Sequence, residues 1–196
     1  MFETFKDKFP LLKDKLNEYA SHYHRIEVPA KTTLLKEGEI SKKAFMIEKG
    51  CIRAWFNSDG KDITFQFFFE NSVVASIESF RKNIPSLVTI ETIEPSIVWR
   101  IDKKDMDIIL EDMKEIPQLR DMFINGVFER TFDYMKHFFS SIKDSPLQRY
   151  QNLLKEKPHI VQRVPQHYIA SYLGITTVHL SRIKSKLAKE SRSSGI

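Results

Sequence analysis

The stretch "QHYIASYLGITTVHLSRIKSKL", residues 166–187, contains two short helical patterns separated by a single glycine, Gly174. We expect a helix over residues 166–173, a turn over 174–176 and a second helix over 177–187. Gly174 suits the end of the first helix because a positive φ costs glycine little, and Thr176 can cap the second helix. The apolar residues that would fill this corner are Ile169, Leu173, Ile175, Leu180, Ile183 and Leu187. This spacing predicts a helix-turn-helix.

The outward face of the second helix is polar and basic. An arginine can form two hydrogen bonds with a guanine edge in the major groove of DNA, so we expect Arg182 to read bases. The alternative is a helical hairpin that only closes a domain, with Arg182 an ordinary surface residue. The residues that we predict to contact bases or phosphates are Gln166, Thr176, Thr177, Val178, His179, Ser181, Arg182, Lys184 and Lys186.

The charge of the chain is unevenly distributed. Residues 145–196 hold nine Lys or Arg and two Glu, a net charge of +7, whereas residues 1–144 hold 22 basic and 24 acidic residues, a net charge of −2. A small basic unit joined to a nearly neutral one is typical of a polyanion-binding module attached to a regulatory or catalytic body. The alternative is a solvated surface that happens to be basic.

Several classes of protein are disfavoured by the composition. The single cysteine, Cys51, fits a reducing compartment and excludes a disulfide within the chain. No run approaches the roughly 20 apolar residues of a membrane helix, and residues 2–9 alternate Phe with charged residues, unlike a signal peptide. We therefore expect a cytoplasmic protein without a membrane partner. The sequence has no Walker loop, HExxH or GxSxG motif, and we expect neither an enzyme nor a metal site.

The N-terminal half changes from a helical to a strand period. Residues 10–24 predict a helix with Leu11, Leu12, Leu16 and Tyr19 on one side. From residue 25 to residue 101, short alternating stretches separated by Gly, Pro, Asn and Asp predict a compact antiparallel barrel or sandwich. These stretches are "KAFMIEKGCIRAWF", "ITFQFFF", "SLVTIETI" and "SIVWRI". In the second of them we expect Ile63, Phe65, Phe67 and Phe69 to face the core, the alternative being a Phe-lined ligand slot.

A long helix is predicted over residues 118–141, with two apolar stripes. One stripe packs a helix on its own domain, and a second requires another surface, for which an identical helix of a partner chain is the simple candidate. The alternative is a helix buried between two domains of one chain. The predicted dimer residues are Phe123, Val127, Phe128, Phe132, Tyr134, Met135, Phe138 and Phe139. Ser145, Pro146 and Gln148 then predict the capped start of a new helix, and we place a domain boundary at residues 144–145.

Four stretches, "VPAKTTLLKEGE", "FMIEKGCIRAWF", "DGKDITFQFFFENSVVASIESF" and "VPQHYIASYLGITTVHLSRIK", resemble the Crp/Fnr family of transcription regulators in its Bacteroidetes-type form. The resemblance implies an α+β fold: an N-terminal cyclic-nucleotide-binding-type β jelly roll, a long dimerisation helix and a C-terminal winged helix-turn-helix. The implied domains are residues 1–116 for sensing, 117–144 for dimerisation and 145–196 for DNA binding. It also implies a bacterial homodimer that binds double-stranded DNA with two-fold symmetry and has RNA polymerase as a further partner.

Two departures from the family bear on ligand and target. Members that bind cyclic AMP carry a Gly-Glu pair and an Arg-Ser pair, which here align with Ala75-Ser76 and Ser86-Leu87. Without the carboxylate and the guanidinium we expect no cyclic AMP, no certain cofactor and an unidentified small-molecule effector, with Arg81 as an alternative source of the missing cation. The candidate effector pocket comprises Val74, Ala75, Ser76, Arg81, Ser86 and Leu87.

The start of the recognition helix is the second departure. Cyclic-AMP-type members begin it with Arg-Glu, where this chain has Thr177-Val178, and only Arg182 keeps its place. We therefore expect a different DNA target. The alternative function is a ligand-binding or protein-interaction module of the same fold that no longer reads DNA.

Overall fold

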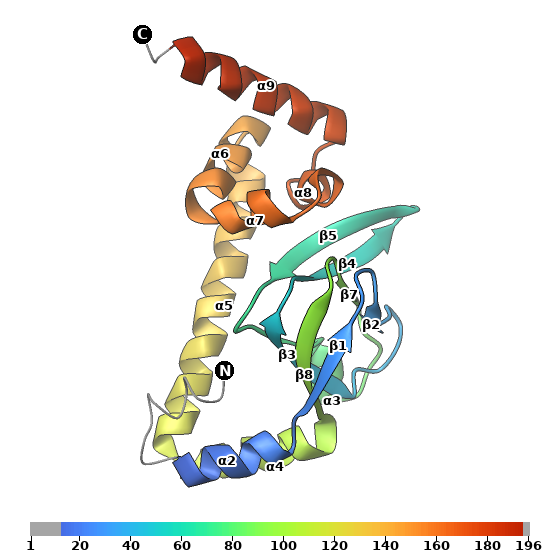
Figure 1. Cartoon of the computed structure of the whole chain (residues 1–196), viewed down its shortest axis with the longest axis vertical. Coiled ribbons are helices and arrows are strands. Elements are labelled where there is room, and N and C mark those ends of the chain that lie inside the picture. The colour runs from blue at the N-terminus through green and yellow to red at the C-terminus, as the bar shows by residue number, and fades with distance from the viewer. Residues whose placement is uncertain (1–12, 194–196) are drawn as a thin grey trace. The chain divides into compact units, whose positions relative to one another are not determined.

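The computed structural model describes residues 13–193 of the chain (Figure 1). The chain divides into two compact units. The first, here named the β unit, consists of Met1–Phe56 and Gln66–Asp121; the second, the helical unit, consists of Asn57–Phe65 and Met122–Ile196. Leu11 and Leu12, which were expected to begin the first helix, lie outside the described residues, and that helix, α2, is described over Lys13–Ser21.

Two four-stranded antiparallel sheets build the β unit. Their strand orders are β1-β8-β3-β6 and β2-β7-β4-β5. The strands are β1 (His24–Val28), β2 (Thr33–Leu35), β3 (Lys43–Lys49), β4 (Ile52–Ser58), β5 (Lys61–Phe68), β6 (Val73–Val74), β7 (Thr89–Thr92) and β8 (Ser96–Asp102). Alternating residues of both sheets meet in one core, formed by Leu35, Phe45, Ile47, Ile52, Ala54, Phe68, Val74, Ile90 and Val98. The predicted jelly roll is confirmed.

Strand β5 departs from the predicted pattern of inward and outward residues. Phe68, on the face opposite to the one expected, belongs to the core, whereas Phe65 is 39% exposed. Phe67 is buried as expected. The prediction that Phe65 lies in the core was wrong, because β5 is the edge strand of its sheet and its residues are covered on both faces only near its C-terminal end.

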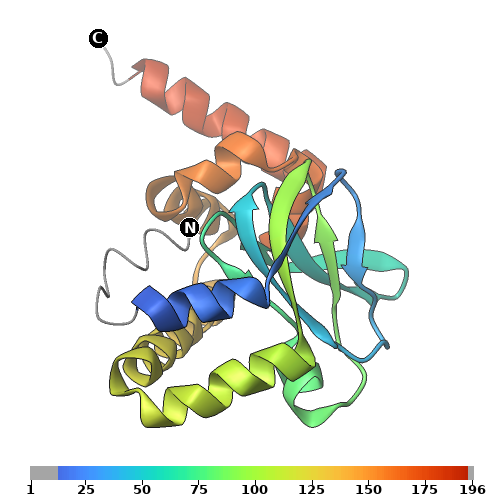
Figure 2. The same cartoon turned by 60° about the horizontal axis from the view of Figure 1, so that its bottom comes forward.

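Three helices complete the β unit: α2, α3 (Ile77–Lys82) and α4 (Lys103–Glu115). Figure 2 shows α2 alongside α4, and Leu16 and Tyr19 of α2 are buried as predicted. The Tyr19 hydroxyl donates a hydrogen bond to Asp112 of α4 at 3.0 Å, and Lys15 forms an ion pair with the same carboxylate at 2.6 Å. Burial and this hydrogen bond raise the pKa of Tyr19 to about 12.

Helices form the described residues from Pro117 to Ser193. They are α5 (Pro117–Lys143), α6 (Pro146–Glu156), α7 (Pro158–Arg163), α8 (Gln166–Tyr172) and α9 (Thr177–Ser193). The predicted capping box is confirmed at the start of α6, where the Ser145 side chain accepts from the Gln148 backbone and the Gln148 side chain accepts from the Ser145 backbone. No strand follows Asp102 within residues 13–193, so the wing implied by the family resemblance is not formed by these residues.

One β-hairpin tip belongs to the helical unit. Residues Asn57–Phe65, which join β4 to β5, cluster with the helices and not with the sheets. The hydroxyl of Ser171 on α8 donates to the Asp62 carbonyl at 2.8 Å and accepts from the Thr64 backbone N–H at 2.8 Å. The Phe65 ring lies 5.1 Å from the ring of Tyr134 on α5. The tip is therefore held by both the long helix and the helix-turn-helix.

Candidate nucleic-acid interface

The corner between α8 and α9 has the predicted geometry. Gly174 has a φ of 64°, a left-handed conformation that residues with a Cβ atom rarely adopt. Its N–H donates to the Ser171 carbonyl at 3.0 Å, and the Ile175 N–H donates to the Ala170 carbonyl at 3.0 Å. This pair of bonds is a Schellman motif, which satisfies the last carbonyls of α8. The Thr176 hydroxyl then accepts from the His179 N–H at 3.2 Å and caps α9, as predicted.

A small apolar core fixes the angle between these helices. Ala170 is 1% exposed, so its small side chain lets α9 approach α8 closely, and Leu180 of α9 is also 1% exposed. The other buried residues of helices α6 to α9 and their connections are Tyr150, Leu153, Ile160, Val164, Ile169, Tyr172, Leu173 and Ile183. The predicted corner residues Ile175 and Leu187 are half-buried at its edge. Packing therefore leaves one face of α9 to solvent.

That outward face contains most of the predicted DNA-contacting residues. Val178 is 60% exposed, and Arg182 is also exposed. Gln166, Thr176, Thr177, His179, Ser181 and Lys186 are exposed as well, and Lys184 is half-buried at the flank. The predicted residues are thus brought together over the range from Thr177 to Lys186 of α9 and at the N-termini of α8 and α9. Such a surface can donate hydrogen bonds to base edges and to phosphates.

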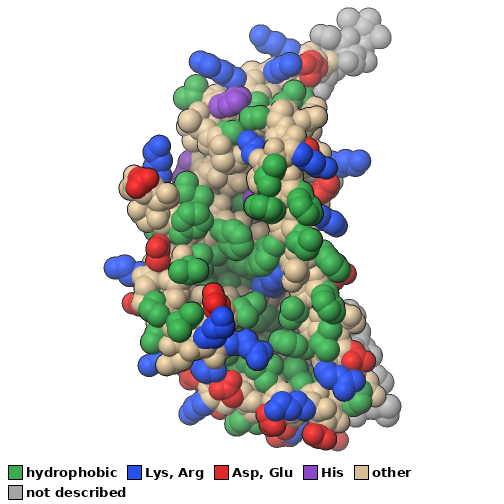
Figure 3. Space-filling view, turned by 180° about the vertical axis from the view of Figure 1, so that it is seen from behind, with side chains coloured by type: hydrophobic (Ala, Val, Ile, Leu, Met, Phe, Trp, Pro, Cys, Tyr) green, Lys and Arg blue, Asp and Glu red, His purple; other side chains and the backbone are tan. Residues whose placement is uncertain are grey.

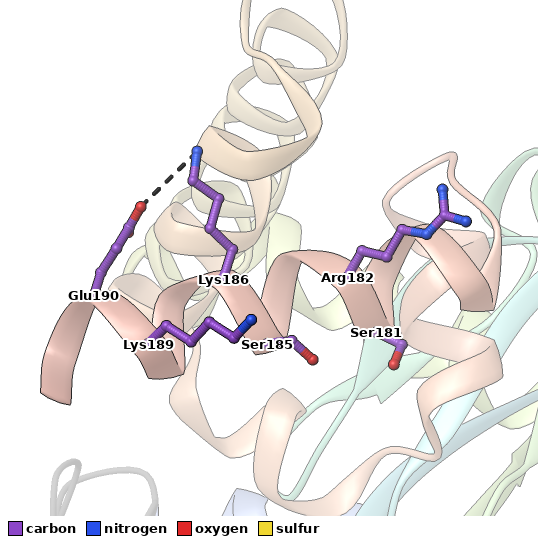
Figure 4. A pocket seen from close by; sticks show the side chains of 6 residues that line it. All are labelled: Ser181, Arg182, Ser185, Lys186, Lys189 and Glu190. Atoms are coloured by element: carbon purple, nitrogen blue, oxygen red, sulfur yellow. Dashed lines mark ion pairs between the residues drawn. The ribbon is translucent and has the colours of Figure 1, made fainter. Parts of the chain in front are cut away.

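The second half of α9 extends this face beyond the predicted end at Leu187. An open hollow of about 390 Å³ is lined by Ser181, Arg182, Ser185, Lys186, Lys189 and Glu190 (Figure 4). Lys186 Nζ lies 3.9 Å from Glu190 Oε1. Sequence reasoning missed Lys189 and Glu190 as part of the face. The run Leu187-Ala188-Lys189-Glu190 could have indicated that the helix continues, because its residues are strong helix formers. Glu190 also lies four residues after Lys186, a spacing that favours an ion pair on a helix.

Two side-chain contacts attach the shorter helices to the long helix within the helical unit, one at the α6–α7 connection and one at α8. Lys157, between α6 and α7, donates to both carboxylate oxygens of Asp133 on α5, at 2.6 and 2.8 Å. The imidazole of His137, one turn later on α5, stacks on the ring of Tyr172 at 4.3 Å. Burial, followed by the nearby charge of Lys157, lowers the pKa of His137, and burial raises the pKa of Tyr172. These contacts position α8 relative to α5.

The long helix exposes a continuous apolar face. Hydrophobic side chains gather over α5 in Figure 3. Seven of the eight predicted dimer residues are between 41% and 60% exposed in this single chain: Phe123, Val127, Phe128, Phe132, Met135, Phe138 and Phe139. Tyr134, the eighth, is half-buried against Phe65. An exposed apolar face of this length is typical of a protein–protein interface.

The candidate effector residues differ in their exposure to solvent. Val74 is fully buried in the core of the β unit, whereas Arg81 is exposed and Leu87 is 74% exposed. Ser86 is 2% exposed, and its hydroxyl donates to the Val88 carbonyl at 2.7 Å and accepts from the Val88 N–H at 3.2 Å. Ala75 and Ser76 are half-buried before α3, and the Ser76 side chain makes no capping hydrogen bond.

The β unit contains a buried cation, Arg53, on the face of a sheet that points away from the core. The side chain of Arg53 is 3% exposed, lies 3.3 Å from Glu91 and stacks over the ring of Trp55 at 4.7 Å. Its neighbours Ile52 and Ala54 belong to the core, so Arg53 faces away from it. The guanidinium is neutralised by Glu91 and cannot replace the cation missing at Ser86 without losing that pair.

Residues 13–193 contain neither a candidate metal site nor a candidate membrane-spanning helix. Over that range no three His, Cys, Asp or Glu side chains are grouped so that they could hold a metal ion. None of the described helices is sufficiently long and apolar to span a membrane.

Comparisons with known proteins agree with this architecture. Residues 25–113 match the family model of the cyclic nucleotide-binding domain. The structure is similar to the c-di-GMP-responsive global regulator CLP of Xanthomonas campestris, with a TM-score of 0.73 and 15% identity over 91% of this chain and 92% of that one. It is also similar to FixK2 of Bradyrhizobium japonicum, with a TM-score of 0.72 and 15% identity over 86% of each chain.

A third similar structure is a mutant of CooA from Carboxydothermus hydrogenoformans, with a TM-score of 0.70 and 14% identity over 91% of this chain and 84% of that one. No curated protein matches the sequence. At these identities the similarity establishes the fold, and it confirms the fold expected from the sequence.

Proposed function

On the premise that the chain has the fold of the Crp/Fnr-type regulators, with a cyclic nucleotide-binding domain at residues 25–113, we propose that it is a sequence-specific DNA-binding transcription regulator. Residues 145–196 bind DNA, 117–144 mediate dimerisation and 1–116 sense a signal. The protein acts in the bacterial cytoplasm, without catalysis, and contacts RNA polymerase at the promoters that it controls.

The outward face of α9 is the observation that carries this proposal. It is exposed, contains Arg182 and Lys186, and has no acidic residue before Glu190. The packed α8–α9 corner holds this face in one orientation, as a helix that enters the major groove requires. Arg182 supplies a planar fork of donors for a guanine, and Val178 offers an apolar contact for a thymine methyl.

The apolar face of α5 supports a homodimer. A second copy of the same helix would bury Phe128, Phe132 and Phe139, whose side chains are at least half exposed in the single chain. Two reading helices related by a two-fold axis would bind half-sites about one helical turn apart. A symmetric DNA target is therefore expected.

The signal sensed by residues 1–116 differs from cyclic AMP bound in the usual way. The charged pair that holds the ribose and phosphate is replaced by neutral residues, and the Ser86 hydroxyl is already used within its own turn. A buried cyclic phosphate would lose charge-assisted hydrogen bonds, each worth about 1.5–3 kcal/mol. The effector is therefore a small molecule of other chemistry.

Selection of bound sequences from a random DNA duplex pool tests the proposal directly. The purified protein, without added effector and at moderate salt, is expected to enrich a two-fold-symmetric motif. Binding should weaken steeply with salt, because each phosphate contact releases counterions. Arg182→Ala should relax one position in each half-site of the motif, at a cost of about 1–3 kcal/mol per half-site.

Two results would contradict the proposed DNA-binding function. If the protein binds no duplex at low salt, with or without a small-molecule extract of cells, the module of the same fold that does not read DNA becomes the better assignment. If a motif is enriched but Arg182→Ala leaves every position unchanged, the reading face has been assigned to the wrong side of α9.

A further inference from the structure

Helix α9 is longer than a major groove is wide. It runs from Thr177 to Ser193, 17 residues, which at 1.5 Å per residue is about 25 Å. The major groove of B-form DNA is about 12 Å wide. A recognition helix contacts base edges with its N-terminal residues, so the C-terminal half of α9 must pass the phosphates that border the groove.

The face of α9 that contains Arg182 continues toward that second half with side chains suited to phosphates. Arg182, Ser185 and Lys189 follow one another at steps of three and four residues, so they share one face of the helix. All three line the same hollow, and Figure 4 shows the Lys189 side chain lying along the helix toward Ser185. Lys189 follows Arg182 by seven residues, or about 10 Å along the axis. A lysine is a compact charge that suits a phosphate, whereas the arginine fork suits a base edge.

Glu190 makes the end of this face less basic. It lines the hollow together with Lys186 and Lys189, and its carboxylate lies 3.9 Å from Lys186 Nζ. Figure 4 shows Lys186 and Glu190 reaching toward each other, whereas Lys189 is directed along the helix toward Ser185. Both side chains are more than half exposed, so the ion pair is weak and a DNA phosphate can replace Glu190 as the partner of Lys186.

We propose that the C-terminal half of α9 is a separate phosphate-binding segment, in which Lys189 anchors the reading helix on the DNA backbone and Glu190 weakens binding by competing for Lys186. This inference rests on the proposed function and concerns the same helix. Lys189 adds affinity without sequence preference. Arg182 provides sequence preference, so the two roles lie on one helix face but two turns apart.

The dependence of DNA affinity on salt separates these roles. Lys189→Gln is expected to weaken binding to all duplexes by the same factor and to leave the selected motif unchanged. It should lower the slope of log affinity against log salt by about 1.8 for the dimer, about 0.9 for each of its two Lys189 side chains. Glu190→Gln is expected to tighten binding and to steepen the slope. The matched control is Lys104→Gln, which removes the same charge from an exposed position on α4 of the β unit.

The outcomes distinguish this inference from the proposed function. If the wild-type protein selects no motif, the proposed function fails. If it selects a motif that depends on Arg182, but Lys189→Gln changes the salt slope no more than Lys104→Gln, only the phosphate-binding segment is overturned. A loss of affinity in Glu190→Gln would contradict the competition for Lys186, and circular dichroism of that variant would show that α9 is intact.

Discussion

Serine residues occur both on α9 and at the candidate effector position, in opposite settings. Ser181 and Ser185 are exposed beside Arg182, whereas Ser86 is buried and bonded to the backbone of Val88. The serine hydroxyls of α9 are therefore available to solvent, whereas the Ser86 hydroxyl is used by the backbone of its own turn. The difference teaches that residues of the same type can be open to contact on one surface and closed within a turn on another.

The exposed face of α9 depends first on the buried side chains beneath it, which hold the helix in place. Leu180→Ala is expected to destabilise the helical unit by about 2–5 kcal/mol, because the side chain is 1% exposed and its removal leaves a cavity. Val178→Ala, on the same helix but 60% exposed, should change stability by less than about 0.5 kcal/mol. Thermal unfolding and hydrogen exchange of the α9 amides measure both effects. Equal losses of stability in Leu180→Ala and Val178→Ala would mean that the α8–α9 corner has no packed core beneath α9.

A change of pH is expected to have a smaller effect on stability, through the contact between α5 and α8. The pKa of His137 is lowered in the folded chain, so the unfolded chain binds the proton first as pH falls through about 6.5. Stability should thus be unaffected above that pH and should decrease below it, until the lowered pKa of the folded state is passed. Asp133, Lys157, Arg149 and Tyr172 surround the ring.

Hydrogen exchange of the α8 amides between pH 7.5 and 5.5 follows this effect. His137→Gln should flatten the pH dependence. His167→Gln is the matched control, since His167 contacts the neighbouring Tyr168 at 3.9 Å but is exposed. If the pH dependence persists in His137→Gln and disappears in His167→Gln, the titrating ring is His167 and the assignment to His137 is wrong.

No effect at all is expected from cyclic AMP on the β unit. A ligand present at 100 times its dissociation constant stabilises a fold by about 2.7 kcal/mol, which thermal unfolding detects easily. We expect no shift of Tm with cyclic AMP, because Ser86 provides no cation for its phosphate. A shift that Arg81→Gln abolishes would show that Arg81 supplies the cation from the exposed face of α3 and would overturn the comparison.

Features fixed by local chemistry were predictable from the sequence. The Ser145–Gln148 capping box and the positive φ of Gly174 depend on residues within six positions of one another, and both are as predicted. The burial of Ile169, Leu180 and Ile183 follows from helical spacing and is also confirmed. These features sufficed to predict the exposed polar face of α9.

Features that depend on distant contacts were not predictable. Which face of β5 is buried depends on the elements that cover this edge strand. The alternation of residues along the strand therefore could not show that Phe68 belongs to the core. The bond between Ser171 and Asp62 joins residues 109 positions apart, and no local pattern marks it. The inclusion of Lys189 and Glu190 in the face depended on where α9 ends, which is the least certain property of a helical pattern.

The hairpin tip held by Ser171 affects how this chain can be divided. Because Asn57–Phe65 clusters with the helices, the polypeptide passes between the units at three peptide bonds: 56–57, 65–66 and 121–122. A fragment that begins at residue 122 would leave Ser171 without the Asp62 and Thr64 backbone groups that it bonds. The helical unit is therefore not one continuous segment that a single recombination event could exchange, and a chimaeric protein would have to inherit this strand turn along with α5–α9.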